Sequence, residues 1–189
     1  MRETNASEKW IEAGYELFAK EGPEGIQVER LARIVKLNKS GFYHYFGDME
    51  RYSSRLVEHH YWLFDIFLDD VATCRNIDPD YVNVLIKHKI MVMAQIQLVR
   101  NKSNPYYHGA HKLPDLKIGH AVLPIWARHI NIPNNAELAF QYHSLVRDVF
   151  YARVNLDNFN YNYLRELSNE SKEIIAKILR ERNTGAVTV

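Results

Sequence analysis

Apolar side chains recur at helical spacing along almost the whole chain, and this period constrains the fold more than any other feature of the sequence. Residues three and four positions apart share one face of an α-helix. Only eight glycines and six prolines interrupt 189 residues, and no run alternates as a strand would. The sequence therefore predicts an all-α fold. The longest stripe implies about seven turns from a cap at Asp48 and runs through Tyr52, Leu56, His60, Leu63, Phe67 and Val71.

Residues that start and stop helices divide the N-terminal part of this pattern. A first helix is expected to end at Gly22-Pro23, and a short second helix covers about residues 28–35. Lys36-Leu37 forms the turn that follows. Asn38 is a good N-cap for a third helix that ends near Phe46.

The rest of the chain is divided less clearly. Asp78-Pro79 combines a cap with a proline at the first helical position, so we expect a helix from there to about residue 99. Four prolines between residues 101 and 133 predict short helices and loops. Asn134 is expected to cap a helix to about residue 155, and a last helix covers about 160–181.

Composition excludes several classes of protein. The net charge is +1, so any attraction for nucleic acid must come from a local basic patch. The single Cys74 excludes an internal disulfide framework and fits a reducing compartment. The chain begins without the apolar stretch of a signal peptide, and its most apolar run, residues 90–99, is too short to span a bilayer. We expect a cytoplasmic protein that makes no membrane contact.

The segment NKSGFYHYF, residues 38–46, concentrates aromatic rings on a short helix after a tight turn. With 3.6 residues per turn, Phe42 and Phe46 share one face, which we expect to lie in the core. Two short helices joined by a tight turn and supported by a longer first helix describe a helix-turn-helix unit. The opposite face carries Lys39, Ser40, Tyr43 and His44, with Tyr45 between the two faces.

These helices, with the motifs IEAGYELFAKEG and VERLARIVKLNKSGFYHYF, resemble the TetR family of transcriptional regulators over about residues 10–56. The resemblance implies a DNA-binding domain over residues 1–47 and a helical domain for ligand binding and dimerisation over residues 48–189. It also implies a homodimer that binds palindromic double-stranded DNA as a repressor and is released by a small-molecule effector.

The exposed face of the third helix suits contact with a DNA major groove. A lysine and hydroxyl groups bind phosphates, and small side chains let a helix lie deep in the groove. Residues 30–55 hold six basic and two acidic side chains, a local surplus of positive charge. The candidate DNA-binding residues are Lys39, Ser40, Gly41, Tyr43, His44 and Tyr45.

Several positions depart from the family pattern and keep a second interpretation open, among them Ile26 and Gln27, which stand where a serine or threonine usually precedes the second helix. Lys36 stands where the family usually has a glycine, Glu29 where a basic residue is common, and Met49 where a lysine grips a phosphate. Over residues 1–60, nine basic side chains are outnumbered by ten acidic ones. The alternative is a dimeric, family-like protein that has lost DNA binding and acts through a protein partner.

Polar groups on otherwise apolar helical faces mark the candidate effector site. Aromatic and soft apolar lining with a few such groups would suit a largely apolar small molecule with one or two polar handles. The candidate ligand-binding residues are His60, His88, Gln95, Trp126 and His143.

The last two long helices carry apolar stripes that can pack in a four-helix bundle with those of a second subunit, as the resemblance implies. An apolar seam of this length would be a large exposed patch on a monomer. The expected centre of the interface is Leu145, Val149, Leu164, Ile174 and Ile178.

Nine histidines raise the question of a metal or catalytic site. His108 and His111 are three residues apart, but a zinc site needs further ligands and Cys74 is isolated. The sequence holds neither an HExxH motif nor a glycine-rich phosphate loop. We therefore expect no catalytic residue, no metal and no cofactor.

Overall fold

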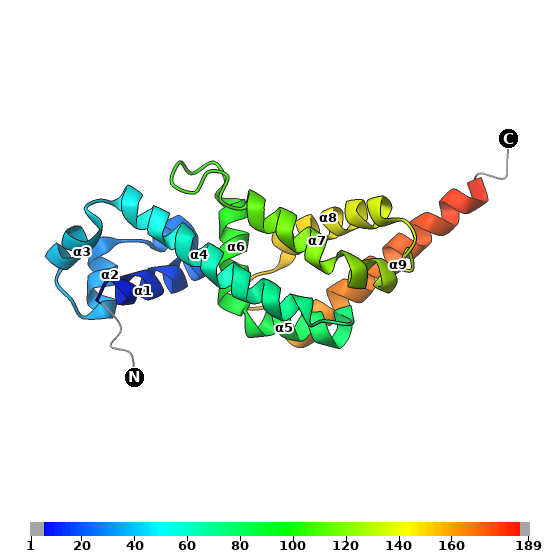
Figure 1. Ribbon diagram of the computed structural model, residues 1–189, viewed down its shortest axis with the longest axis horizontal. Helices are drawn as coiled ribbons and strands as arrows, with labels where there is room; N and C mark the ends of the chain where they lie inside the picture. The colour runs from blue at the N-terminus through cyan, green and yellow to red at the C-terminus, as the bar shows by residue number, and fades with distance from the viewer. Residues whose placement is uncertain (1–5, 186–189) are drawn as a thin grey trace. The chain divides into compact units, whose positions relative to one another are not determined.

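Every regular element in residues 6–185, the part of the chain that the structure describes, is helical. The structure is a computed structural model of the chain, and Figure 1 shows the order of its elements. The all-α class is confirmed. The elements are α1 (Ala6–Glu21), η1 (Gly22–Gly25), α2 (Val28–Val35), α3 (Lys39–Phe46), α4 (Met49–Ala72), η2 (Ile77–Tyr81), α5 (Val82–Lys87), α6 (Lys89–Arg100), α7 (Lys112–His129), α8 (Ala136–Arg153) and α9 (Tyr161–Gly185).

The first four helices begin and end at the expected residues. α1 ends where Gly22 adopts a φ of 71°, in the left-handed region that favours glycine. The Asn38 side chain caps α3 by accepting a hydrogen bond from the Gly41 backbone N–H at 2.9 Å. Asp48 caps α4 in the same way, through the Arg51 N–H at 2.8 Å. α4 then continues for 24 residues, so the predicted long helix is confirmed.

The helix expected from Asp78-Pro79 to about residue 99 is interrupted, so that prediction was wrong. At His88 the backbone has φ −101° and ψ 26°, which separates α5 from α6. Asp78 caps no helix, because its carboxylate accepts a hydrogen bond from the Tyr161 hydroxyl. The Asp80 carboxylate instead accepts hydrogen bonds from the backbone N–H groups of Arg75 and Asn76, at 2.9 and 3.0 Å.

Two further differences follow from proline and asparagine positions. The region in which prolines were expected to break the chain contains one helix of 18 residues, α7. Pro114 lies in its first turn, where a backbone N–H has no intrahelical partner in any case, and Pro124 is tolerated inside it. The cap of α8 is Asn135 rather than Asn134, since its side chain accepts from the Leu138 N–H at 3.0 Å.

The chain packs as two compact units. Unit 1 comprises Met1–Ile66 and His88–Asp115, so α6 lies with the N-terminal helices. α6 packs against α1, and its residues 91–96 are all buried. Residues 1–47 therefore share a unit with most of α4 and with α6, while the functional boundary after residue 47 stays a prediction.

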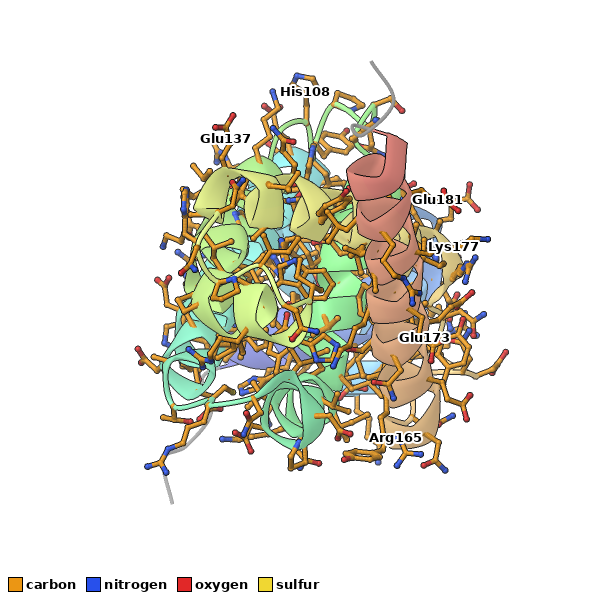
Figure 2. The ribbon with its side chains drawn as sticks, turned by 90° about the vertical axis from the view of Figure 1, so that its right-hand side faces the viewer. His108, Glu137, Arg165, Glu173, Lys177 and Glu181 are labelled. Carbon is orange, nitrogen blue, oxygen red and sulfur yellow. The ribbon has the colours of Figure 1, made fainter. Side chains whose placement is uncertain are left out.

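Unit 2 comprises Phe67–Lys87 and Leu116–Val189. Within it, α9 contacts α5 and α8, and the Trp126 indole N–H donates to the Ala139 carbonyl at 3.0 Å, which joins α7 to α8. Figure 2 shows α9 from outside, with a row of charged side chains along it that includes Arg165, Glu173, Lys177 and Glu181.

In residues 6–185, no single helix is both long and apolar enough to cross a membrane. The bent pair Ile77–Lys87 and Lys89–Arg100 meets that requirement by length and composition only when its two helices are taken together.

Candidate DNA-binding site

The turn between α2 and α3 depends on one residue in the left-handed region. Lys36 has φ 56° and ψ 40°, a conformation that costs a residue with a Cβ roughly 1–2 kcal/mol. The Leu37 backbone N–H then donates to the Ala32 carbonyl at 3.1 Å and closes the end of α2. This geometry gives a physical reason why glycine suits such a turn.

α3 buries one face and exposes the other. Phe42 is 0% exposed and Phe46 is 6% exposed, so their expected burial is confirmed, whereas Tyr43 is 49% exposed. Tyr45, expected between the two faces, is 44% exposed. The exposed candidates are Lys39, Ser40, Tyr43, His44 and Tyr45, and Gly41 is half-buried.

Aromatic packing holds α3 in place. The Phe42 ring lies against Trp10 of α1 and Tyr52 of α4, with ring centroids 5.6 and 4.9 Å apart. The Tyr52 hydroxyl donates to the Trp10 carbonyl at 2.7 Å. Gly14 makes room for it, since a Cβ at that position would lie 1.8 Å from the Tyr52 hydroxyl oxygen. The helical period predicts Tyr52 in a buried stripe, but nothing in the sequence pairs it with Gly14.

Carboxylates accompany the basic side chains of this region. The Lys39 ammonium donates to the Glu29 carboxylate, and this hydrogen bond lowers the pKa of the Glu29 carboxyl. Arg30 donates two N–H groups to Glu21 in the same manner. The local surplus of positive charge is therefore compensated by acids that lie outside residues 30–55. Met49, in the first turn of α4, is half-buried.

Residues 11–51 match the sequence profile described as "Bacterial regulatory proteins, tetR family". The matched segment runs from α1 through α2 and α3 to the start of α4, the elements whose packing is given above. Residues 11–51 are thus similar to the helix-turn-helix domain of the TetR family. The family is one of bacterial regulatory proteins, and the matched residues form its helix-turn-helix. No curated protein matches the sequence.

Two solved structures share the fold of this chain along nearly its whole length. A transcriptional regulator of Aquifex aeolicus, described as "TerR/AcrR family", has a TM-score of 0.59 at 17% identity and covers 92% of this chain and 99% of that one. A protein of Mesorhizobium loti, described as a TetR-family transcriptional regulator, has a TM-score of 0.61 at 13% identity, with coverage of 94% and 98%. The likeness of fold thus extends to the C-terminal helices.

In unit 1, His60 and Gln95 belong to a buried chain of hydrogen bonds. Gln95 Nε2 donates to Asp115 Oδ1 at 2.8 Å and to the His111 carbonyl at 3.2 Å, so Gln95 Oε1 is the acceptor. His60 Nε2 lies 2.9 Å from that oxygen and must donate to it. Burial lowers the pKa of His60 to about 4, so the ring is neutral and its Nδ1 accepts from the Tyr15 hydroxyl at 2.8 Å. Both ring nitrogens of His60 are therefore satisfied by protein groups.

A small cavity adjoins this chain of hydrogen bonds. Its volume of about 10 Å³ has room for roughly one water molecule, whereas ligand pockets hold about 300–1,000 Å³. An effector role for His60 and Gln95 stays a prediction, and the observed geometry gives both residues a structural role. The lining includes Tyr15, Phe18, Leu56, His60, Leu98 and Tyr107.

Trp126 and His143 pack together in unit 2, with ring centroids 5.9 Å apart. His143 is 7% exposed, and its Nδ1 is buried with no hydrogen-bond partner among the described residues. Burial lowers the pKa of this imidazole to about 4. Gly119 lies beside it, because a Cβ there would be 3.8 Å from His143 Nδ1. The candidate effector residues thus form two pairs in different units, while half-buried His88 marks the break before α6.

Four of the five residues expected at a dimer interface are exposed. On α8, Leu145 is 62% and Val149 is 38% exposed; on α9, Ile174 is 52% and Ile178 is 39% exposed. The two members of each pair are four residues apart and so share one helical face. Leu164 is only 4% exposed and packs inside unit 2, which leaves it outside this set.

Proposed function

We propose that this regulator is a homodimeric repressor that binds palindromic DNA in the cytoplasm and is released by a small, largely apolar molecule. The observation that carries the proposal is the exposed face of α3. Its buried Phe42 is packed against Trp10 and Tyr52, so the helix is held firmly enough to present a fixed pattern of side chains. A recognition helix in a helix-turn-helix inserts such a face into the major groove.

Each exposed residue of α3 has chemistry that suits DNA. Lys39 stands at the first position of the helix and supplies a phosphate contact. Gly41 has no side chain to keep α3 away from the groove floor. Tyr43 and His44 carry rings that can reach base edges or thymine methyl groups, so they contribute to the choice between sequences.

Selection of binding sites from random duplexes at low salt tests DNA binding. Enrichment of a palindrome with half-sites about 10 base pairs or a multiple apart is expected. Tyr43→Ala and His44→Ala should weaken binding to the selected operator. Glu12→Ala, an exposed change on α1, should not. Failure to enrich any sequence would refute the proposal.

Dimerisation is supported by the exposed apolar pairs on α8 and α9. Light scattering should give about twice the chain mass of 22.2 kDa. Leu145→Glu should yield monomer or insoluble protein, because a charge would stand in the apolar contact. Leu116→Glu is the matched control, since Leu116 of α7 is 52% exposed and lies outside the proposed interface. A wild-type mass near that of one chain would refute this part.

The effector site is best supported at Trp126 and His143. A buried imidazole nitrogen without a partner would gain a hydrogen bond from a polar handle on an otherwise apolar ligand. Apolar and aromatic compounds that release the selected operator should lose that effect in His143→Leu, while the affinity of the free protein for operator is kept. If His143→Leu responds to such compounds as the wild type does, the site lies elsewhere.

A second candidate function is that of an adaptor that acts through a protein partner. The Lys39–Glu29 ion pair favours it, because Lys39 is then paired with a carboxylate instead of being available to a DNA phosphate. Selection at low salt separates the two functions. Absence of any DNA binding, with dimerisation intact, would favour the adaptor.

A further inference from the structure

The ion pair between Lys39 and Glu29 links the two helices of the helix-turn-helix. Lys39 opens α3, and Glu29 lies in the first turn of α2. The Lys39 side chain is 51% exposed and the Glu29 side chain is 62% exposed. An ion pair this exposed contributes little to folding, because water screens it. Its main effect is on whatever approaches Lys39 from outside.

Most of the neighbouring basic side chains also form ion pairs with carboxylates. Of the six Lys and Arg residues between positions 30 and 55, four have a carboxylate partner. Residues 21–58 hold six basic and six acidic side chains, so the helix-turn-helix region has no net charge. Among these pairs, Lys39–Glu29 is distinctive because its cation stands on the recognition helix. The pairs are Arg30–Glu21, Lys39–Glu29, Arg51–Asp48 and Arg55–Glu58.

An internal carboxylate changes how a lysine binds DNA. A lysine that meets a phosphate normally gains affinity because the condensed counterions of the DNA are released. Lys39 must first leave Glu29, and the freed carboxylate then stands near a polyanion. On DNA of the wrong sequence, no base contact by Tyr43 or His44 compensates for this cost. On an operator, base contacts hold α3 in the groove and bring Lys39 to the phosphate.

We propose that Glu29 is an internal competitor with DNA phosphate for Lys39, and that it favours the operator by suppressing nonspecific binding. This inference rests on the proposed DNA-binding function. In nonspecific complexes Lys39 stays with Glu29, whereas in the operator complex Lys39 has exchanged Glu29 for phosphate. Glu29 is thus a specificity-determining residue that need not contact a base.

The test compares a selected operator with a scrambled duplex of the same length, by fluorescence anisotropy over a salt series. Glu29→Gln keeps the size of the side chain and removes its charge. For the scrambled duplex, the log–log salt slope should steepen by about 0.9 per subunit, equal to one new phosphate contact. At about 0.1 M salt this corresponds to roughly a five- to tenfold gain in nonspecific affinity per subunit. The operator slope should stay the same, so the ratio of operator to nonspecific affinity should fall.

Two controls separate this effect from a general change of charge. Glu16→Gln makes the same charge change in an ion pair with Lys20 on α1, at 3.2 Å, and should leave the scrambled-duplex slope unchanged. In a Lys39→Ala background, Glu29→Gln should give no steeper slope, since no lysine is released.

The outcomes are distinguishable. If the wild type binds operator and Lys39→Ala weakens it, yet Glu29→Gln behaves like Glu16→Gln, the competitor role is refuted while DNA binding stands. A steeper slope that persists in the Lys39→Ala background would also refute it. If neither the wild type nor any variant binds DNA at low salt, the proposed function and this inference are both overturned.

Discussion

Replacing Gln95 by leucine should destabilise unit 1 through the hydrogen bonds that meet at its amide. His60 is 1% exposed, and Gln95 supplies the only acceptor that its Nε2–H has among the described residues. A buried donor left without a partner costs about 1–3 kcal/mol. The charge-assisted hydrogen bond from Gln95 to Asp115, at 2.8 Å, is lost as well, although it is only partly buried.

Together these losses should lower the free energy of unfolding by about 2–4 kcal/mol, less whatever the leucine gains by packing. For a chain of this length, 1 kcal/mol shifts Tm by about 2–4 °C, so Tm should fall by about 5–15 °C. Thermal and urea unfolding followed by circular dichroism measure this at one fixed protein concentration, because a dimer's Tm depends on concentration.

Gln97→Leu is the matched control. Gln97 is on the same helix and is half-buried, and its side-chain oxygen accepts a hydrogen bond from the Asn101 amide at 3.3 Å. It should cost less than about 1 kcal/mol. If Gln95→Leu and Gln97→Leu are equally stable, the hydrogen-bonded chain does not hold α4 and α6 together, and the assignment of donors and acceptors along it loses its support.

Three other perturbations test separate features. Acid should destabilise the protein through His60 and His143, because their pKa of about 4 in the folded state lies below the ordinary value of 6.5. As the pH falls, the unfolded chain therefore binds protons before the folded chain does. The contribution of these two histidines to the free energy of unfolding is fully present above about pH 6.5 and is lost progressively toward pH 4. The loss should approach about 3 kcal/mol per histidine, and unfolding midpoints of His143→Phe between pH 7 and 4.5 should fall less steeply than those of the wild type. Gly14→Ala should lower the free energy of unfolding by at least about 1–3 kcal/mol, because the added Cβ clashes with the Tyr52 hydroxyl. The double variant with Tyr52→Phe should lose less stability than the sum of the two single changes. Additive losses in urea unfolding would contradict this contact. Lys36→Gly should stabilise the folded protein by up to about 1 kcal/mol, because glycine adopts the left-handed conformation of this turn without strain. Arg33→Gly, inside α2, should destabilise it by about the same amount. A lower urea midpoint for Lys36→Gly would argue against strain at the turn.

The N-terminal helices could be predicted closely because their signals are local. Asn38 and Asp48 cap helices with their own side chains, and the 3.6-residue period alone assigns Phe42 and Phe46 to the core. The break at His88 could not be predicted, because the apolar stripe continues across it. Packing of α6 in unit 1 overrides the local pattern there.

The site was harder to predict because its properties depend on residues far apart in the sequence. Helical geometry gave the exposed face of α3 but not the ion pair with Glu29, ten residues away. His60 and Gln95 were expected to be ligand contacts because they are polar on apolar faces. Their partners, Tyr15 and Asp115, lie 45 and 20 residues from them, and only the folded chain brings these groups together.

The place of α6 in unit 1 limits how far the DNA-binding part of this protein can be treated as an interchangeable module. The path of the chain leaves unit 1 after Ile66, returns at His88 and leaves again after Asp115. A fragment cut after the helix-turn-helix would lack α6, and the apolar side of α1 that α6 covers would be open to water. Hybrid proteins that join this helix-turn-helix to the ligand-binding domain of another protein should therefore include residues 88–115 as well, or a helix that replaces α6. Evolutionary exchange by simple N-terminal fusion would meet the same obstacle.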